Sequence, residues 1–282
     1  MNLRNLPFYF AAVFIAIALL VSACSSRQEE DLLNLGAKQS KNILEEINNS
    51  NALSHMGIAH NEIVDLLISQ HGSTLRSSDM TDTESYEFIK EKVFESIGKY
   101  EIPGLSLRSE SGVVITQEEF NEIYDDVVLL NYGKKTEDMV FYTSDDAKYL
   151  SDKQKEFIDE IEIIMKDTDL SIESVLNRIS KVQDGAINNL SEEELAVVLT
   201  ATSIAANTCS YWHNYFKENT LRADFSWKEV GVSDVGGAVA GAVAAGARWV
   251  FCGPPGWKLT AALVVGGAAG ASAANAVKQL LL

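Results

Sequence analysis

The sequence predicts an all-α protein, made of an antiparallel helical domain followed by a C-terminal helical hairpin rich in glycine and alanine. Two observations predict helices. Capping boxes recur directly before apolar stripes whose members are three and four residues apart. The chain also has only four prolines in 282 residues, two of them adjacent, which disfavours a β-sandwich. A hydrophobic fraction of 46% is that of a folded globular chain.

The first segment, residues 1–23, is predicted to be a signal peptide. An uncharged apolar run from Phe8 to Val21 follows Arg4, and it is too short to span a bilayer as a stable helix. The run ends in Val21-Ser22-Ala23-Cys24, a branched apolar residue and two small residues before a cysteine. This arrangement resembles the lipobox of bacterial lipoproteins. The resemblance implies that residues 1–23 are removed and that acyl chains on Cys24 attach the protein to a lipid bilayer.

The second segment, residues 24–50, is predicted to be an acidic tether and a short helix that the polar run 48–51 ends. Ser25 follows the cysteine, which resembles the outer-membrane sorting signal of Gram-negative lipoproteins. The acidic run 29–31 is similar to the surface-export tag of Bacteroidetes lipoproteins. A plain solvated tether fits that run as well, so the sequence leaves open whether the protein faces the periplasm or the cell surface.

The third segment, residues 51–230, is predicted to be an acidic domain of amphipathic helices. We expect them from about Ala52 to Gln70 with Gly72 as the stop, from Glu84 to Ile97, after Thr116, after Ser151, from Leu170 to Ile187, and from Ser191 to about Phe216. The loop near Met139 to Tyr142 leaves room for a short strand. Because Ala196 to Ala206 is almost continuously apolar or small, the last of these helices is expected at the centre of the domain.

The fourth segment, residues 231–282, is predicted to be a hairpin of two alanine-rich helices. We expect the first from Asp234 to Phe251 with Ser233 as its N-cap, a turn at 252–256, and the second from Trp257 or Lys258 onward. Small residues recur every four positions and make one face of each helix flat, so that two backbones can approach closely; the glycines among them are Gly237, Gly241, Gly266 and Gly270.

The sequence leaves the environment of this hairpin open. Glycine inside a helix costs about 1 kcal/mol relative to alanine, so the hairpin needs a packed partner or lipid. Leu259 to Val277 is uncharged and long enough to cross a bilayer, whereas Arg248 shortens the apolar part of the first helix. Membrane insertion, packing in a soluble core and self-association all fit. The hairpin is similar to the glycine-zipper hairpins of small secreted bacteriocins and of some outer-membrane lipoproteins. Through 57–62, 201–205 and 211–212 the chain is also similar to uncharacterised Bacteroidetes proteins, which imply no established activity.

Charge and motifs exclude several function classes. The net charge of −17 repels phosphate backbones, which disfavours a nucleic-acid partner. No zinc-ligand spacing, phosphate-binding loop or other cofactor motif is present. His60 and Glu62 are the candidate catalytic residues, but His60 shares an apolar stripe with Met56 and Val64, which favours a histidine of the core. Cys209 and Cys252 either pair in an oxidising envelope or stay as buried thiols.

From these observations we expect a non-catalytic binding or structural role at the cell envelope. One alternative is a membrane-active antagonist similar to a bacteriocin that uses the C-terminal hairpin. A second alternative is an envelope hydrolase that uses His60 and Glu62.

Overall fold

All regular structure longer than an isolated bridge is helical in the part of the chain that the computed structural model describes, residues 38–77, 80–99, 114–132, 134–219, 226–249 and 257–281. The fold class is therefore all-α, as the sequence predicts. The chain divides into two units, Met1–Asn42 and Ile43–Leu282, and every helix from Ser54 onward belongs to the second. The signal peptide, Cys24, the acidic run and Cys252 lie outside the described residues.

Residues 38–50 form a helix, and Asn51 separates it from the next one. The amide nitrogen of the Asn51 side chain donates to Gln183 Oε1 (2.7 Å) and to the carbonyl of Leu199 (2.9 Å), while its oxygen accepts from the backbone N–H of Leu53 (2.8 Å). The helix is therefore broken only at Asn51, the last residue of the predicted break, since 48–50 are still helical. The longer elements that follow are α2 (Ser54–Ser77), α3 (Asp82–Lys99), α4 (Gln117–Val128), α5 (Asp152–Lys166), α6 (Ile172–Asn189), α7 (Glu192–Asn219), α8 (Trp227–Trp249) and α9 (Trp257–Leu281).

Two of the predicted capping boxes form as expected. The Thr116 hydroxyl accepts from the backbone N–H of Glu119, and the Glu119 side chain accepts from the backbone N–H of Thr116. Ser151 and Gln154 form the same two bonds. Each box satisfies backbone donors that a helix start leaves unpaired, which is why α4 and α5 begin where the sequence predicts.

Three local predictions are wrong. Gly72 does not end α2, which continues to Ser77, because burial of Leu75 (3% exposed) offsets the modest cost of a helical glycine. Ser233 is not an N-cap, since α8 begins at Trp227 and Ser226 accepts from the backbone N–H of Glu229. Residues 139–142 form no strand. The Asn131 side chain instead bonds both the N–H and the carbonyl of Val140, in place of a strand partner.

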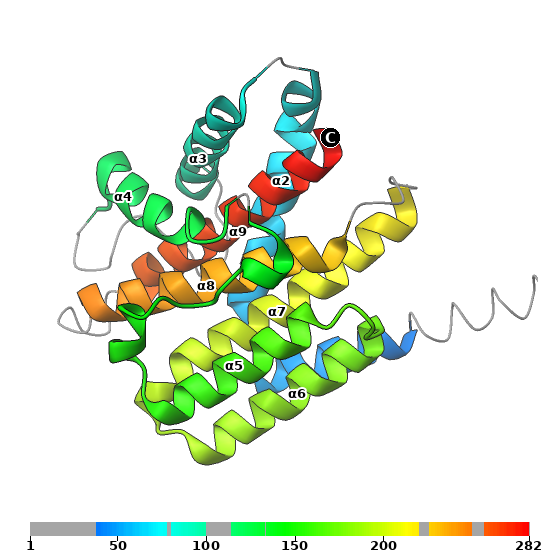
Figure 1. Cartoon of the computed structure of the whole chain (residues 1–282), viewed down its shortest axis with the longest axis vertical. Helices are drawn as coiled ribbons and strands as arrows, with labels where there is room; N and C mark the ends of the chain where they lie inside the picture. The colour runs from blue at the N-terminus through cyan, green and yellow to red at the C-terminus, as the bar shows by residue number, and fades with distance from the viewer. Residues whose placement is uncertain are drawn as a thin grey trace, which may run out of the picture. The chain divides into compact units, whose positions relative to one another are not determined.

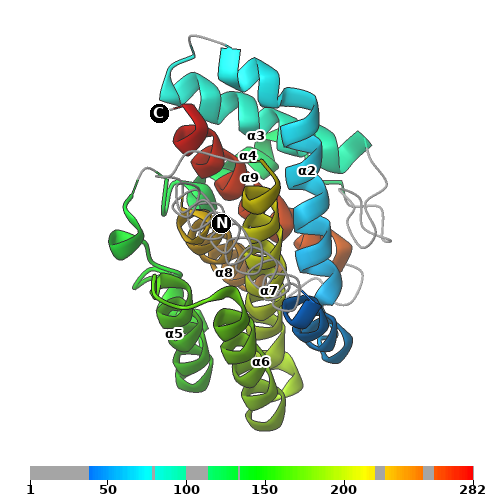
Figure 2. The same ribbon diagram turned by 90° about the vertical axis from the view of Figure 1, so that its right-hand side faces the viewer.

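The two alanine-rich helices lie in the middle of the fold. Figure 1 shows α8 and α9 crossing between α3 and α4 on one side and α5, α6 and α7 on the other. In the view turned by 90°, α9 lies among α2, α3 and α4 (Figure 2). α8 packs on α9, α7, α4 and α5. The boundary expected at residue 231 falls inside α8, and both helices belong to the same unit as the amphipathic helices.

The four glycines singled out from the sequence all face protein. A Cβ atom at Gly237 would lie 3.2 Å from the Cα of Ala268, and one at Gly241 would lie 3.1 Å from the Cα of Val264, so both sit where α8 touches the backbone of α9. On α9, Gly266 faces Phe120 and Gly270 faces Tyr124, both on α4. None of the helices, within the described residues, has the length and hydropathy needed to cross a membrane.

Candidate functional site

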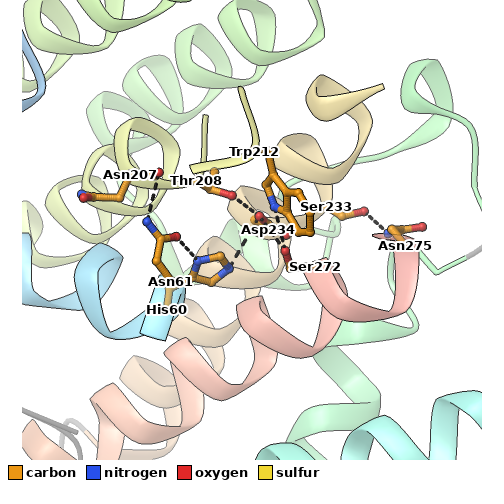
Figure 3. A network of polar contacts seen from close by, with 9 residues as sticks. All are labelled: His60, Asn61, Asn207, Thr208, Trp212, Ser233, Asp234, Ser272 and Asn275. Carbon is orange, nitrogen blue, oxygen red and sulfur yellow. Dashed lines mark hydrogen bonds and ion pairs between the residues drawn. The ribbon is translucent and has the colours of Figure 1, made fainter. Parts of the chain in front are cut away.

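A buried polar cluster lies where α2, α7, α8 and α9 meet (Figure 3). His60 comes from α2 and Asp234 from α8, Thr208 and Trp212 come from α7, and Ser272 comes from α9. All five residues are 0% exposed. His60 points inward because it lies on the apolar stripe of α2, and Asp234 because α8 is covered on most sides. The cluster is one of two buried polar networks in the interior, and the other surrounds Asn51 and Gln183.

The hydrogen bonds of Asn61 determine which nitrogen of His60 carries a proton. The amide nitrogen of Asn61 donates to the carbonyl of Asn207 (3.1 Å), so its oxygen faces His60 Nδ1 at 2.9 Å. That oxygen only accepts, and Nδ1 is therefore a donor. The other nitrogen, Nε2, faces Asp234 Oδ2 at 3.6 Å, which is longer than a direct hydrogen bond.

The Asp234 carboxyl is held by hydroxyl groups. Its Oδ2 atom accepts from the hydroxyls of Thr208 and Ser272. The indole N–H of Trp212 donates to Ser272 Oγ (3.1 Å), which leaves the Ser272 proton free to point at the carboxyl. The other carboxyl oxygen, Asp234 Oδ1, has no hydrogen-bond partner within the described residues, and neither does His60 Nε2. A neighbouring pair, Asn275 and Ser233, joins α9 to α8.

Burial shifts the pKa of both titratable groups toward their neutral forms. It lowers the pKa of His60 to about 4, against the opposing contacts with Asn61 and the backbone of Ala268. It raises the pKa of Asp234 to about 8, against the opposing effect of the Thr208 and Ser272 hydrogen bonds and of the nearby indole N–H of Trp212. The pair therefore holds a single proton over most of the range between these values.

The structure does not bring the two candidate catalytic residues together. His60 is buried, whereas Glu62 is exposed on the opposite side of α2. The carboxyl that faces His60 belongs instead to Asp234, which sequence reasoning did not select. The available signal was that Asp234 is the only acidic residue of segment 231–282, because an isolated carboxyl in an apolar helix needs a buried partner.

Other chemistry-bearing groups lie apart from this cluster or beside it. Cys209 is a buried free thiol whose sulfur lies 3.6 Å from the sulfur of Met165, and burial raises its pKa. Cys252 lies outside the described residues, so the pairing of Cys209 with Cys252 stays a prediction. Across the described ranges, His, Cys, Asp and Glu form no group of three or more suited to a metal ion.

A surface cleft of about 650 Å³ lies between the first turns of α3 and α4. It contains none of the residues singled out from the sequence. Most of its lining residues are polar or charged, including Glu84, Glu87 and Glu91, although they contribute much apolar side-chain surface. Lys90 in the same wall bonds Glu87 and also Asp125 of α4 (3.0 Å), so this ion pair joins the two helices.

Comparison of the chain with protein-family models, with curated proteins and with solved structures finds no match.

Proposed function

We propose that this chain is a lipoprotein of the bacterial outer membrane, held to the bilayer by acyl chains on Cys24, with a non-catalytic binding or structural role at the cell envelope. The observation that carries the proposal is the apolar run Phe8 to Val21 followed by Val21-Ser22-Ala23-Cys24. Two acyl chains anchor a protein stably, whereas one is marginal. The helical domain then needs no membrane-spanning segment of its own.

A non-catalytic role is supported by the closure of the polar cluster. His60 and Asp234 are both 0% exposed, and α2, α7, α8 and α9 surround them. A general base has to lie within hydrogen-bond reach of its substrate. A hydrolase that uses His60 and Glu62 is not supported, because the two side chains lie on opposite sides of α2.

The anchor is tested by metabolic labelling of the full chain with an alkyne fatty acid in a Gram-negative host, followed by mass spectrometry of the mature amino terminus. We expect a diacylated or triacylated peptide that begins at Cys24 and a protein that sediments with outer membranes. Cys24→Ser should lose both the label and the sedimentation. Cys209→Ser is the matched control and should keep both, because Cys209 is buried inside the domain. An unlabelled wild type, or a labelled Cys24→Ser protein, would contradict the proposal.

A membrane-active antagonist is the second candidate, and one observation favours it: the side chains of α8 and α9 that the structure describes are mostly apolar or small, and most of them are buried. Deleting the hairpin does not separate the two functions, because α9 is central to the fold. Disulfide locks do. An added Cβ at Gly267 lies 3.5 Å from Val127 Cβ on α4, and one at Gly241 lies 3.7 Å from Val264 Cβ on α9, distances that suit a disulfide.

Val127→Cys/Gly267→Cys ties the hairpin to α4, whereas Gly241→Cys/Val264→Cys ties only its two helices to each other. The lipoprotein proposal predicts no dye leakage from phospholipid vesicles for either protein, oxidised or reduced. Leakage that the first lock abolishes, that reduction restores and that the second lock spares would support the antagonist. Self-association through the glycine face of α9 meets a further obstacle, since α3 and α4 already occupy that face. Protease treatment of intact cells separates surface from periplasmic exposure.

A further inference from the structure

The hydrogen-bond directions around His60 and Asp234 leave a place for one proton. His60 Nδ1 already donates to Asn61, and Asp234 Oδ2 already accepts from two hydroxyls. Without a proton on Nε2 or on the carboxyl, a nitrogen lone pair and a carboxylate face each other across 3.6 Å in a site with no exposed atoms. Two acceptors in that position repel each other, and buried unpaired polar groups are costly.

The same two residues come from helices that are distant in sequence. His60 lies in the second turn of α2, and Asp234 lies two turns into α8, whose partner α9 supplies Ser272. Thr208 and Trp212 add α7. The cluster is therefore a polar junction between the α8–α9 hairpin and the two helices, α2 and α7, that lie beside it (Figure 3).

We propose that the His60–Asp234 pair is a one-proton latch, which holds the α8–α9 hairpin against α2 and α7 while the proton is present and loosens the hairpin when the proton leaves. The latch is a conformational device and does not depend on the lipoprotein proposal.

The other titratable groups near the pair do not replace the missing proton. On α7, the Cys209 thiol has a pKa raised by burial and stays neutral. On α4, burial likewise raises the pKa of the Tyr124 hydroxyl. On α8, the Lys228 ammonium group donates to the carbonyl of Asp167, at the start of the helix. The α9 side chains in the cluster, Ser272 and Asn275, do not titrate.

The pH at which the latch releases follows from the two states of the pair. In the closed state Asp234 keeps the proton up to about pH 8. In an opened, solvated state the proton belongs to His60, which loses it near its ordinary pKa of 6.5. Opening therefore releases a proton between these two values, and it becomes about tenfold easier with each pH unit, or about 30-fold in all.

Hydrogen exchange of the full chain, followed by mass spectrometry of peptides at pH 6, 7 and 8.5 and corrected for intrinsic exchange rates, tests the latch. We expect peptides of α8 around Asp234 to lose protection about 30-fold relative to peptides of α6, which does not contact the cluster. Asp234→Asn, which has the same shape and does not titrate, should abolish this loss of protection. Only His60 then titrates, and because the opened state takes up its proton below pH 6.5, the protection of α8 should instead rise about threefold between pH 6 and 7. Asp65→Asn is the matched control, because Asp65 joins α2 to Tyr211 of α7 at the exposed surface, and it should keep the wild-type dependence.

Protection in α8 that does not change with pH in the wild-type protein would overturn the latch. The same conclusion would follow if Asp234→Asn folded and kept the wild-type dependence. If Asp234→Asn fails to fold, nitrogen NMR of the His60 ring in the wild-type protein decides instead. A change in the ring signals between pH 7 and 9 that parallels the exchange data would support the latch, and ring signals that stay constant would overturn it.

Discussion

Replacement of Gly270 by alanine adds one methyl group at the closest approach between α9 and α4. The added Cβ would lie 2.2 Å from both Cε2 and Oη of Tyr124, whereas carbon atoms in contact are usually 3.5–4.0 Å apart. Tyr124 is only 1% exposed, and the rings of Phe120 and Tyr86 lie 5.6 and 5.7 Å from its own. The ring therefore has to move by more than about 1 Å in a space that is already filled.

The expected magnitude combines two opposing effects. Overpacking of this kind costs about 3 kcal/mol or more when the neighbours are confined. Alanine improves on glycine in a helix by about 1 kcal/mol. We expect Gly270→Ala to lower the free energy of unfolding by about 2–3 kcal/mol, measured by urea denaturation with circular dichroism.

Gly185→Ala is the matched control. Gly185 also lies inside a helix, α6, but its added Cβ would meet only the half-buried ring of Phe157 at 3.1 Å. We expect that variant to be unchanged or stabilised by up to about 1 kcal/mol. In a double-mutant cycle, Tyr124→Ala should recover most of the penalty of Gly270→Ala, because the ring that causes the clash is gone.

A Gly270→Ala protein as stable as Gly185→Ala, or a cycle in which the two effects simply add, would refute the close approach of α9 to α4. The central position of α9 would then be wrong as well.

Three further changes test the interior. Tyr124→Phe removes a buried hydroxyl that has no hydrogen-bond partner among the described residues, so the free energy of unfolding should rise by about 1 kcal/mol; a decrease in urea denaturation would indicate a missed partner. Asn51→Ala removes three buried hydrogen bonds, including the one accepted from the backbone N–H of Leu53, while the Thr202 hydroxyl still donates to Gln183 Oε1 or to the Leu199 carbonyl. It should lower the free energy of unfolding by about 1–3 kcal/mol, and an unchanged midpoint would contradict these hydrogen bonds. For the wild-type protein, the folded pair keeps its proton to about pH 8 through Asp234, while the unfolded pair loses it near 6.5 through His60. The native state thus binds more protons in that window, and the free energy of unfolding should fall by about 2 kcal/mol as pH rises through it. The pair itself contributes no change from pH 4 to 6.5, where it holds one proton in both states, and Asp234→Asn should abolish the fall.

Local signals in the sequence were enough to predict the fold class and most helices. The boxes at Thr116 and Ser151 act within one turn, so no distant contact was needed to place α4 and α5. The errors arose where a distant contact outweighs a local preference. Gly72 is a typical helix stop, but the buried Leu75 beyond it keeps α2 helical. Ser233 is a good N-cap, but here its hydroxyl bonds Asn275 of α9.

The site was predictable only in part. The apolar stripe of α2 correctly indicated that His60 lies in the core, because a period of three and four residues fixes a helix face. Its partner was not predictable in the same way. Asp234 belongs to another helix, and the meeting of the two depends on how α8 crosses α2 and α7, which no local pattern specifies. The sequence did show an isolated carboxyl in an apolar segment, and that feature pointed to a buried partner without naming it.

The small residues of the hairpin and the proton of the buried pair are physically connected through Gly237. A Cβ at this position would press on the Cα of Ala268 at 3.2 Å, and the backbone of Ala268 contacts His60. Gly237→Ala should therefore separate α8 from α9 beside the pair and admit water. Because desolvation is the main cause of the raised pKa of Asp234, hydration should lower that pKa and reduce the loss of stability between pH 6.5 and 8.

Gly241→Ala is the control for this coupling. It meets the Cα of Val264 at a similar distance, 3.1 Å, but one turn farther from Asp234. Urea denaturation at several pH values should show a reduced alkaline loss for Gly237→Ala and a wild-type loss for Gly241→Ala. Equal pH profiles for the two variants would mean that the close backbone approach and the dryness of the pair are independent. In that case the glycines serve only to bring the two helices together.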